Sequence, residues 1–214
     1  MKSTEHKPGY PVSLAWLSVY LLVLVWSGIN PADNMTWLLE VLPAMVALIV
    51  LAATFQSHPL TPLVYLLILI QAVVLMIGGH YTYADVPVFE QIAALSGGRN
   101  NYDKLAHFIQ GFVPAMVARE IILRTRAIPD KYWRTFFIGC FCLALSAFYE
   151  LIEWWVALIS QEAADSFLGT QGYIWDTQSD MFWALIGATI ALLTLSAQHD
   201  RQLKKLSVPH PAPP

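Results

Sequence analysis

The sequence predicts an all-α fold: a polytopic membrane helix bundle with about six transmembrane helices, forming a single domain over residues 1–200. Hydrophobic residues make up 57% of the 214-residue chain and charged residues 13%. An average soluble domain has roughly 45–50% apolar and about 25% charged residues. Apolar stretches of about 20 residues recur, the length that a helix needs to cross roughly 30 Å of hydrocarbon. Because lipid cannot satisfy open backbone polar groups, these stretches should be helical.

Composition also excludes two other classes of protein. Aromatic residues make up 13% of the chain, which is incompatible with a disordered or low-complexity protein. The formal net charge of −3 leaves no basic surplus for a phosphate backbone, so no nucleic-acid partner is expected. Membrane lipids are the expected surroundings and partners.

The first three predicted spans are the most apolar. Residues 11–29 contain no charge, 35–55 carry only Glu40, and 60–79 have Gln71 as their most polar member. Each is about 20 residues long, so each can cross a bilayer as one helix.

The other three spans are more polar. Residues 103–124 and 133–158 are long enough to cross, and 180–197 is apolar after Asp180. The remaining residues 201–214 end in VPHPAPP and are expected to form a disordered cytoplasmic tail.

The distribution of Lys and Arg predicts the orientation. With six spans, the face that carries both termini collects ten of these residues, and the other face has Arg99 and Lys104, which together make the twelve in the chain. Because cytoplasmic loops are enriched in Lys and Arg, both termini are expected in the cytoplasm.

Ionisable residues within predicted spans are the candidates for function, because placing them in a membrane costs several kcal/mol. On three helices they share single stripes, at spacings of three and four residues. The stripes are Asp103, His107 and Gln110 on the fourth helix, Ser146, Glu150 and Glu153 on the fifth, and Asp176 and Asp180 on the sixth.

Depth predicts that these stripes meet. His107, Glu150 and Asp180 each lie five residues from an interfacial aromatic residue, which is about 7 Å at 1.5 Å per residue. The three side chains are therefore expected at one level near the outer face. Three further acids are expected about one turn outward: Asp103, Glu153 and Asp176.

An imidazole with several carboxylates is the ligand set of Zn, Mn or Fe centres. We therefore predict that His107, Glu150 and Asp180 hold one divalent metal ion. Glu153 or Asp176 is the candidate catalytic base toward a water whose pKa the ion lowers.

Other polar residues at the same end could cover this site or contact a substrate. The candidate substrate-binding residues are His80, Tyr83, Arg99, Asn100 and Gln110. Arg99 could pair with a phosphate group. Glu120 lies about 26 Å from Asp103 along its helix, so it should instead pair with Arg124 at the inner face.

The segments RNNYDKLAHFIQGFVPAMVAREIILR, YELIEWW and FLGTQGYIWDTQSDMFWALIGA resemble the YjdF-type family of bacterial inner-membrane proteins, whose function is unknown. The resemblance covers most of the chain, is specific from His80 to Gly187, and implies an inner-membrane location. Tyr173 stands where the family's pattern has an acid. The DK-x-x-H element, a later acidic helix and D-x-x-x-D are also similar to the VanZ-like membrane family, associated with glycopeptide resistance. Neither family implies an established reaction.

Three functions therefore remain open. The polar residues could form a network that only fixes helix packing. They could serve a metal-assisted hydrolase or transferase that acts on a lipid or lipid-linked group at the outer leaflet. They could also belong to a non-catalytic protein that binds a lipid, ion or periplasmic solute, or to a small transporter.

The orientation can be tested with reporter fusions. A reporter fused after residue 205 should lie in the cytoplasm, and one inserted within 160–170 should lie in the periplasm, because basic residues are retained inside. Paired fusions to alkaline phosphatase and to a fluorescent protein measure both positions. A periplasmic reporter after residue 205 would contradict the six-span arrangement.

Overall fold

The computed structural model describes residues 14–96, 98–159 and 173–206, and these contain seven α-helices and no strand. The all-α prediction is confirmed for this part of the chain. The helices are α1 (Leu14–Ser27), α2 (Asn34–Thr54), α3 (Pro62–Tyr81), α4 (Pro87–Ser96), α5 (Tyr102–Thr125), α6 (Lys131–Ile159) and α8 (Asp176–Leu206).

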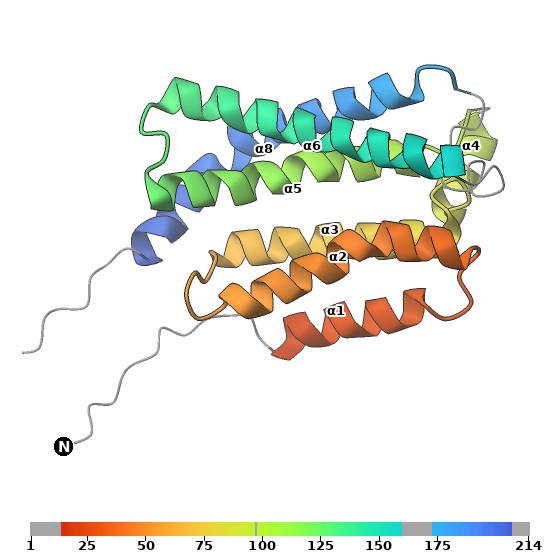
Figure 1. Cartoon of the computed structure of the whole chain (residues 1–214), viewed down its shortest axis with the longest axis horizontal. Helices are drawn as coiled ribbons and strands as arrows, with labels where there is room; N and C mark the ends of the chain where they lie inside the picture. Colours follow the sequence, from red (N-terminus) through yellow and green to blue (C-terminus); the bar gives the residue numbers. More distant parts are fainter. Residues whose placement is uncertain (1–13, 97, 160–172, 207–214) are drawn as a thin grey trace, which may run out of the picture.

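The long helices form two layers that lie side by side (Figure 1). One layer contains α1, α2 and α3, and the other contains α5, α6 and α8. Contacts between α3 and α5 join the layers. The short α4 lies at one end of the bundle, and the first residue of α1 and the last residue of α8 lie at the other.

Five helices are long and apolar enough to cross a membrane: α2, α3, α5, α6 and α8. The described part of α1 has 14 residues and is shorter than the predicted span 11–29. Helix α8 extends beyond the predicted span 180–197 at both ends, so residues 201–206 of the predicted tail are helical. Residues 207–214 lie outside the described residues.

Local sequence explains where α2 and α3 begin. The Asp33 carboxylate accepts a hydrogen bond from the Thr36 backbone N–H at 2.7 Å, which caps α2 and lowers the pKa of Asp33. Thr61 caps α3 in the same way, and Pro62 occupies the first helical position, where its missing N–H costs nothing.

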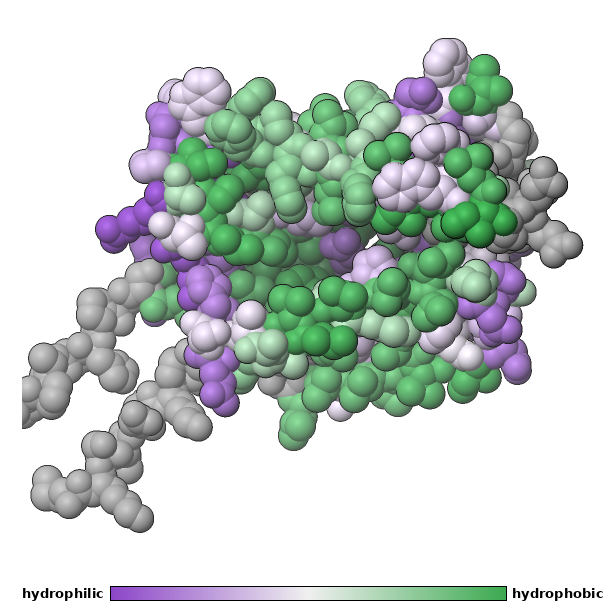
Figure 2. Space-filling model, in the orientation of Figure 1, coloured by the Kyte–Doolittle hydropathy of each residue, from purple (hydrophilic) through white to green (hydrophobic). Residues whose placement is uncertain are grey.

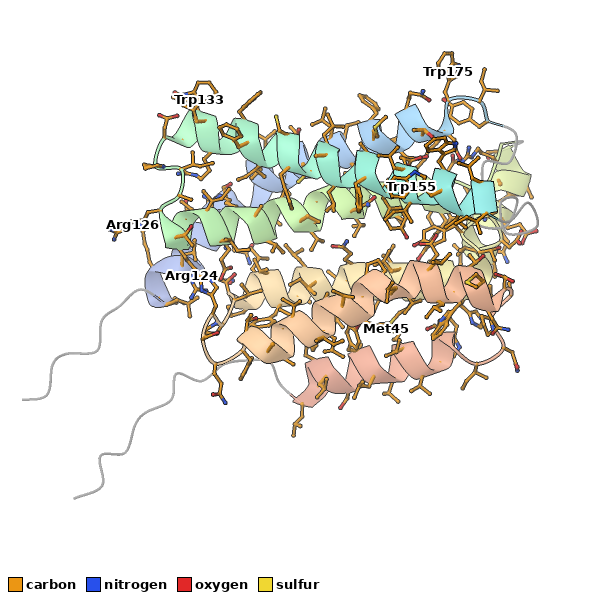
Figure 3. All side chains as sticks on the ribbon, in the orientation of Figure 1. Met45, Arg124, Arg126, Trp133, Trp155 and Trp175 are labelled. Carbon is orange, nitrogen blue, oxygen red and sulfur yellow. The ribbon has the colours of Figure 1, made fainter. Side chains whose placement is uncertain are left out.

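The two ends of the bundle carry different residues (Figure 3). Trp155 and Trp175 lie at the end that carries α4, which we call the site end, and Trp133, Arg124 and Arg126 lie at the other, the basic end. Figure 2 shows apolar residues over the middle of this face and polar residues gathered mainly toward its two ends, as expected for a protein surrounded by lipid. The other described basic residues on the helices of the basic end are Arg119, Lys131, Arg134, Arg201, Lys204 and Lys205.

The tightest helix packing in the bundle is between α5 and α8, and glycine makes it possible. A Cβ atom on Gly111 would overlap the carbonyl oxygen of Ala184, and one on Gly187 would overlap the carbonyl oxygen of Phe108. Small residues allow the backbones of membrane helices to approach this closely. The crossing therefore fixes the position of α5 relative to α8 along their lengths.

Replacing Gly111 by Ala tests this packing. The added methyl group must push α8 away, and overpacking of this kind costs about 1–3 kcal/mol. We therefore expect Gly111→Ala to lower the thermal unfolding temperature of the purified protein in detergent.

Gly139→Ala is the matched control, because a Cβ at Gly139 meets no atom within 4 Å. This change should leave the unfolding temperature equal or slightly raised, since Ala favours a helix over Gly by about 1 kcal/mol. Equal effects of the two substitutions would contradict the proposed role of Gly111.

Candidate functional site

Helices α5, α6 and α8 bring their polar stripes together at the site end. His107, Glu150 and Asp180 are all buried. The His107 Nε2 atom lies 3.6 Å from Glu150 Oε1 and 3.5 Å from Asp103 Oδ1. We call His107 and the acids around it, Asp103, Glu150, Glu153 and Asp180, the outer cluster.

Two sets of potential ligand atoms share His107. Asp103, His107 and Asp180 form one set, and His107, Glu150 and Glu153 form the other, with the donor atoms of each set within 4.8 Å of one another. The three predicted ligands therefore lie in one cluster but are divided between the two sets. Asp103 and Glu153, which were expected one turn further out, join them.

Side-chain direction explains this difference. Long side chains in an α-helix lean toward its N-terminus. The His107 imidazole therefore lies at the level of Asp103, one turn earlier in α5. The Glu153 side chain likewise reaches back toward Glu150 in α6. Depth counted from Cα positions does not include this lean.

The two separations at His107 Nε2 are longer than hydrogen bonds and compatible with ligands around an ion. Protein hydrogen bonds measure about 2.7–3.2 Å between heavy atoms, which is shorter than the two separations at His107 Nε2. Two ligands at about 2.0–2.2 Å from a tetrahedral zinc ion are themselves roughly 3.4 Å apart. The separations of 3.5 and 3.6 Å therefore suit two ligands of one ion.

Three buried atoms of the outer cluster lack a hydrogen-bond partner among the described residues. They are His107 Nδ1, Glu150 Oε1 and Asp180 Oδ1. Buried polar atoms in native proteins are bonded in about nine cases in ten or more, so three at one place need an explanation. They also belong to the three residues that the sequence indicated as metal ligands.

Arg99 neutralises part of this acidic region. Its guanidinium pairs with Asp176 at 2.5 Å and lies 3.8 Å from Asp103. Its Cζ atom also lies 5.4 Å from the ring centre of Tyr173, and the Lys104 Nζ atom lies 5.1 Å from the same ring. The ring face of Tyr173 thus lies against two cations.

A cavity of about 240 Å³ adjoins the outer cluster. It lies between α2 and α3 on one side and α5 and α6 on the other, and His107, Gln110 and Glu153 line it. Tyr83, just after α3, also lines the cavity; burial and the neighbouring Glu40 raise the pKa of Tyr83 well above its usual value. Two of the predicted substrate-binding residues, Tyr83 and Gln110, therefore face this cavity.

The other predicted substrate-binding residues have different surroundings. The His80 Nδ1 atom lies 3.0 Å from the Ser27 carbonyl oxygen, and its ring packs against Trp26. Asn100 donates to the Val86 carbonyl and accepts from the Tyr102 backbone N–H, so it holds the loop before α5. The structure does not place His80 or Asn100 in the cavity.

The sequence interpretation did not assign a role to Glu40 and Tyr149, which also line the cavity. The Tyr149 hydroxyl donates a hydrogen bond of 2.6 Å to Glu40 Oε2. A signal for Glu40 was present, because it is the one charge in its span and lies about as deep as His107. Tyr149 offered no comparable signal, since a tyrosine in a span is common near an interface.

The basic end contains a second buried group with a histidine and a carboxylate. Glu120 accepts hydrogen bonds from the Thr61 backbone N–H and hydroxyl, and its Oε1 lies 3.2 Å from Arg124 Nη1. His199 Nε2 lies 3.0 Å from Glu120 Oε2. The expected pairing of Glu120 with Arg124 is therefore present. We call Glu120, its three partners and Arg119 the inner network.

The inner network leaves no acceptor or donor of Glu120 and His199 unused. Arg119 Nη1 lies 2.8 Å from His199 Nδ1, and because arginine can only donate, that nitrogen must accept. His199 Nε2 then carries the ring proton and donates a hydrogen bond to Glu120 Oε2. The inner network thus shows how a histidine and a carboxylate bond when their role is structural, whereas the outer cluster leaves such atoms unpaired.

Comparison with known proteins agrees with this membrane architecture. The model of the family described as "Predicted membrane protein (DUF2238)" matches residues 12–201. The chain belongs to this family. It is 51% identical over 188 residues to "Inner membrane protein YjdF" of Escherichia coli (strain K12), covering 87% of this chain and 90% of that protein. The resemblance to the YjdF-type family is confirmed. No solved structure matches the chain.

The contrast between the two buried groups predicts different stability effects. Glu120→Gln replaces an acceptor of several hydrogen bonds by an amide that must turn an NH₂ group toward other donors. Losing a hydrogen bond to a charged group costs about 1.5–3 kcal/mol. We expect a marked drop in the thermal unfolding temperature of the purified protein.

Glu150→Gln is the matched change in the outer cluster. Its Oε1 atom makes no hydrogen bond among the described residues and lies 3.6 Å from His107 Nε2, so the metal-free variant should unfold close to the wild-type temperature. If Glu150→Gln destabilised the metal-free protein as much as Glu120→Gln does, the outer cluster would be a packing network.

Proposed function

We propose that this protein is a multi-pass protein of the bacterial inner membrane that binds a divalent metal ion at its outer cluster and uses it to hydrolyse or transfer a lipid-linked group. In this proposal six helices cross the membrane, both termini lie in the cytoplasm, and the site end faces the periplasm. The positive charges of the basic end support this orientation. The printed name of the 51% identical relative supports the inner-membrane location.

One observation carries the metal assignment: the unpaired buried oxygens Glu150 Oε1 and Asp180 Oδ1 beside the His107 imidazole. Like charges this close repel one another, and the ion pairs of Arg99 are with Asp176 and Asp103. A divalent cation would supply the missing charge and accept the free lone pairs. Neutral imidazole and carboxylates suit Zn²⁺, Mn²⁺ or Fe²⁺.

The surroundings distinguish the two candidate bases. Asp176 is engaged by Arg99 at 2.5 Å, so this ion pair occupies its carboxylate. Glu153 lines the cavity and belongs to a ligand set with His107. We therefore assign the role of catalytic base to Glu153. Asp176 instead positions Arg99. A bound ion would lower the pKa of a water molecule, and Glu153 would accept its proton.

The location of the site indicates the substrate class. The cavity lies among membrane helices and is lined by apolar residues in addition to its polar ones. A lipid-linked ester or phosphoester would place its polar group near the outer cluster. The non-catalytic alternative, a protein that only binds a lipid, solute or ion, would use the same cavity without turnover.

Metal binding tests this proposal. Purified protein, freed of metal and then dialysed against Zn²⁺ or Mn²⁺, should retain ion in elemental analysis and gain thermal stability that a chelator removes, since ligands that bind the native state stabilise it. Both Glu150→Gln and Glu150→Ala should lose this gain, because an amide is a far poorer ligand than a carboxylate.

His80→Ala is the matched control, since this histidine lies at the same end but contacts α1. It should bind metal like wild type, whereas His107→Ala should not. Retained binding in His107→Ala, or no effect of metal and chelator on the wild type, would overturn the metal assignment.

A further inference from the structure

A second, larger hollow continues from the cavity along the bundle. It has a volume of about 710 Å³ and is lined by α2, α3 and α5, with Phe141 of α6 at its edge. Ligand pockets usually measure about 300–1,000 Å³ and are mostly apolar. We call this hollow the apolar groove. Pro43, Gln71 and Leu75 line both the groove and the cavity, so the two spaces adjoin.

The groove opens sideways. Helix α2 packs on α3, and α6 packs on α5 and α8. Helices α2 and α6 therefore border the hollow but do not pack against each other along their lengths. Figure 2 shows the resulting hollow between the two layers, with apolar residues on both sides. In a membrane this opening would face the hydrocarbon of the bilayer.

The length of the groove suits one hydrocarbon chain. On α2 its lining runs from Pro43 to Thr54, which is about 16 Å at 1.5 Å per residue. This is about half the thickness of a bilayer core of roughly 30 Å, and because α2 begins at the site end, it is the half toward the basic end. The walls are aliphatic along this length, for example Val50, Ala72 and Val113.

We infer that the apolar groove is a lipid-binding site that takes one acyl chain of a membrane phospholipid from the side, between α2 and α6. The polar part of that lipid then enters the cavity beside Gln110 and His107. This inference deepens the proposed function by naming the substrate class, but the groove can hold a chain whether or not the outer cluster holds an ion.

Photo-crosslinking tests the groove. The protein is reconstituted into vesicles of phosphatidylethanolamine and phosphatidylglycerol that contain a phosphatidylethanolamine with a diazirine at the end of one acyl chain. Ile68 and Val117 line the groove and are partly buried, so a chain seated in the groove lies against them. Labelling of these positions, located by mass spectrometry, is the expected result.

Filling the groove should remove this label. Ala47 lines the groove, so Ala47→Trp should lower labelling of Ile68 and Val117 several-fold. Ala53 is exposed on another side of α2, so Ala53→Trp should not change it. Ala118→Trp blocks the groove from α5 and replaces Ala47→Trp if that variant does not fold.

The outcomes separate this inference from the metal assignment. Labelling in the groove should persist in His107→Ala, whose metal binding is expected to be lost. Labels only on residues outside the groove, or labels in the groove that neither tryptophan reduces, would overturn the inference. If a polyprenyl phosphate displaced the label but excess phospholipid did not, the groove would bind a polyprenyl chain, and the inference that it binds a phospholipid acyl chain would be overturned.

Discussion

The close approach of α5 and α8 at Gly111 and Gly187 is the constraint on which the site depends. His107 lies one turn before Gly111, and Asp180 lies about two turns before Gly187. Because the backbones touch at the glycines, neither helix can slide without collision, and the two polar side chains stay in register. Helix α6 then packs against both and adds Glu150. The position of the outer cluster thus depends on glycine at positions 111 and 187.

The bundle contains two buried groups that each combine a histidine with carboxylates but differ in how their polar atoms are hydrogen-bonded. The inner network satisfies the polar atoms of Glu120 and His199 and joins α3, α5 and α8. The outer cluster keeps acids together with free lone pairs beside a cavity. Proteins break the rules of polar satisfaction mainly at functional sites, and the energy is recovered elsewhere in the fold. The hydrogen bonds of the inner network thus contrast with the unpaired oxygens of the outer cluster.

Sequence reasoning was most successful where a one-dimensional signal exists. Span length and hydropathy predicted the five long helices, and spacing predicted that the stripes of α5, α6 and α8 meet. It could not give the division of ligands between two sets, because this depends on the direction in which His107 and Glu153 lean. Nor could it show that α2 faces α6, which brings Glu40 to Tyr149 from positions 109 residues apart. Helix rotation and layer order are set by packing, which a single sequence does not display.

The hydrogen bond between Tyr149 and Glu40 has an energetic consequence for the layers. Among the described residues it is the one side-chain hydrogen bond that joins α2 to α6. Breaking one such bond costs about 1–3 kcal/mol, depending on whether the acceptor is charged. That energy corresponds to a factor of roughly 5 to 150 in an equilibrium constant. Thermal motion alone would therefore part the two helices often, so a bulky amphipathic molecule could pass between them without nucleotide hydrolysis or an ion gradient to drive its entry.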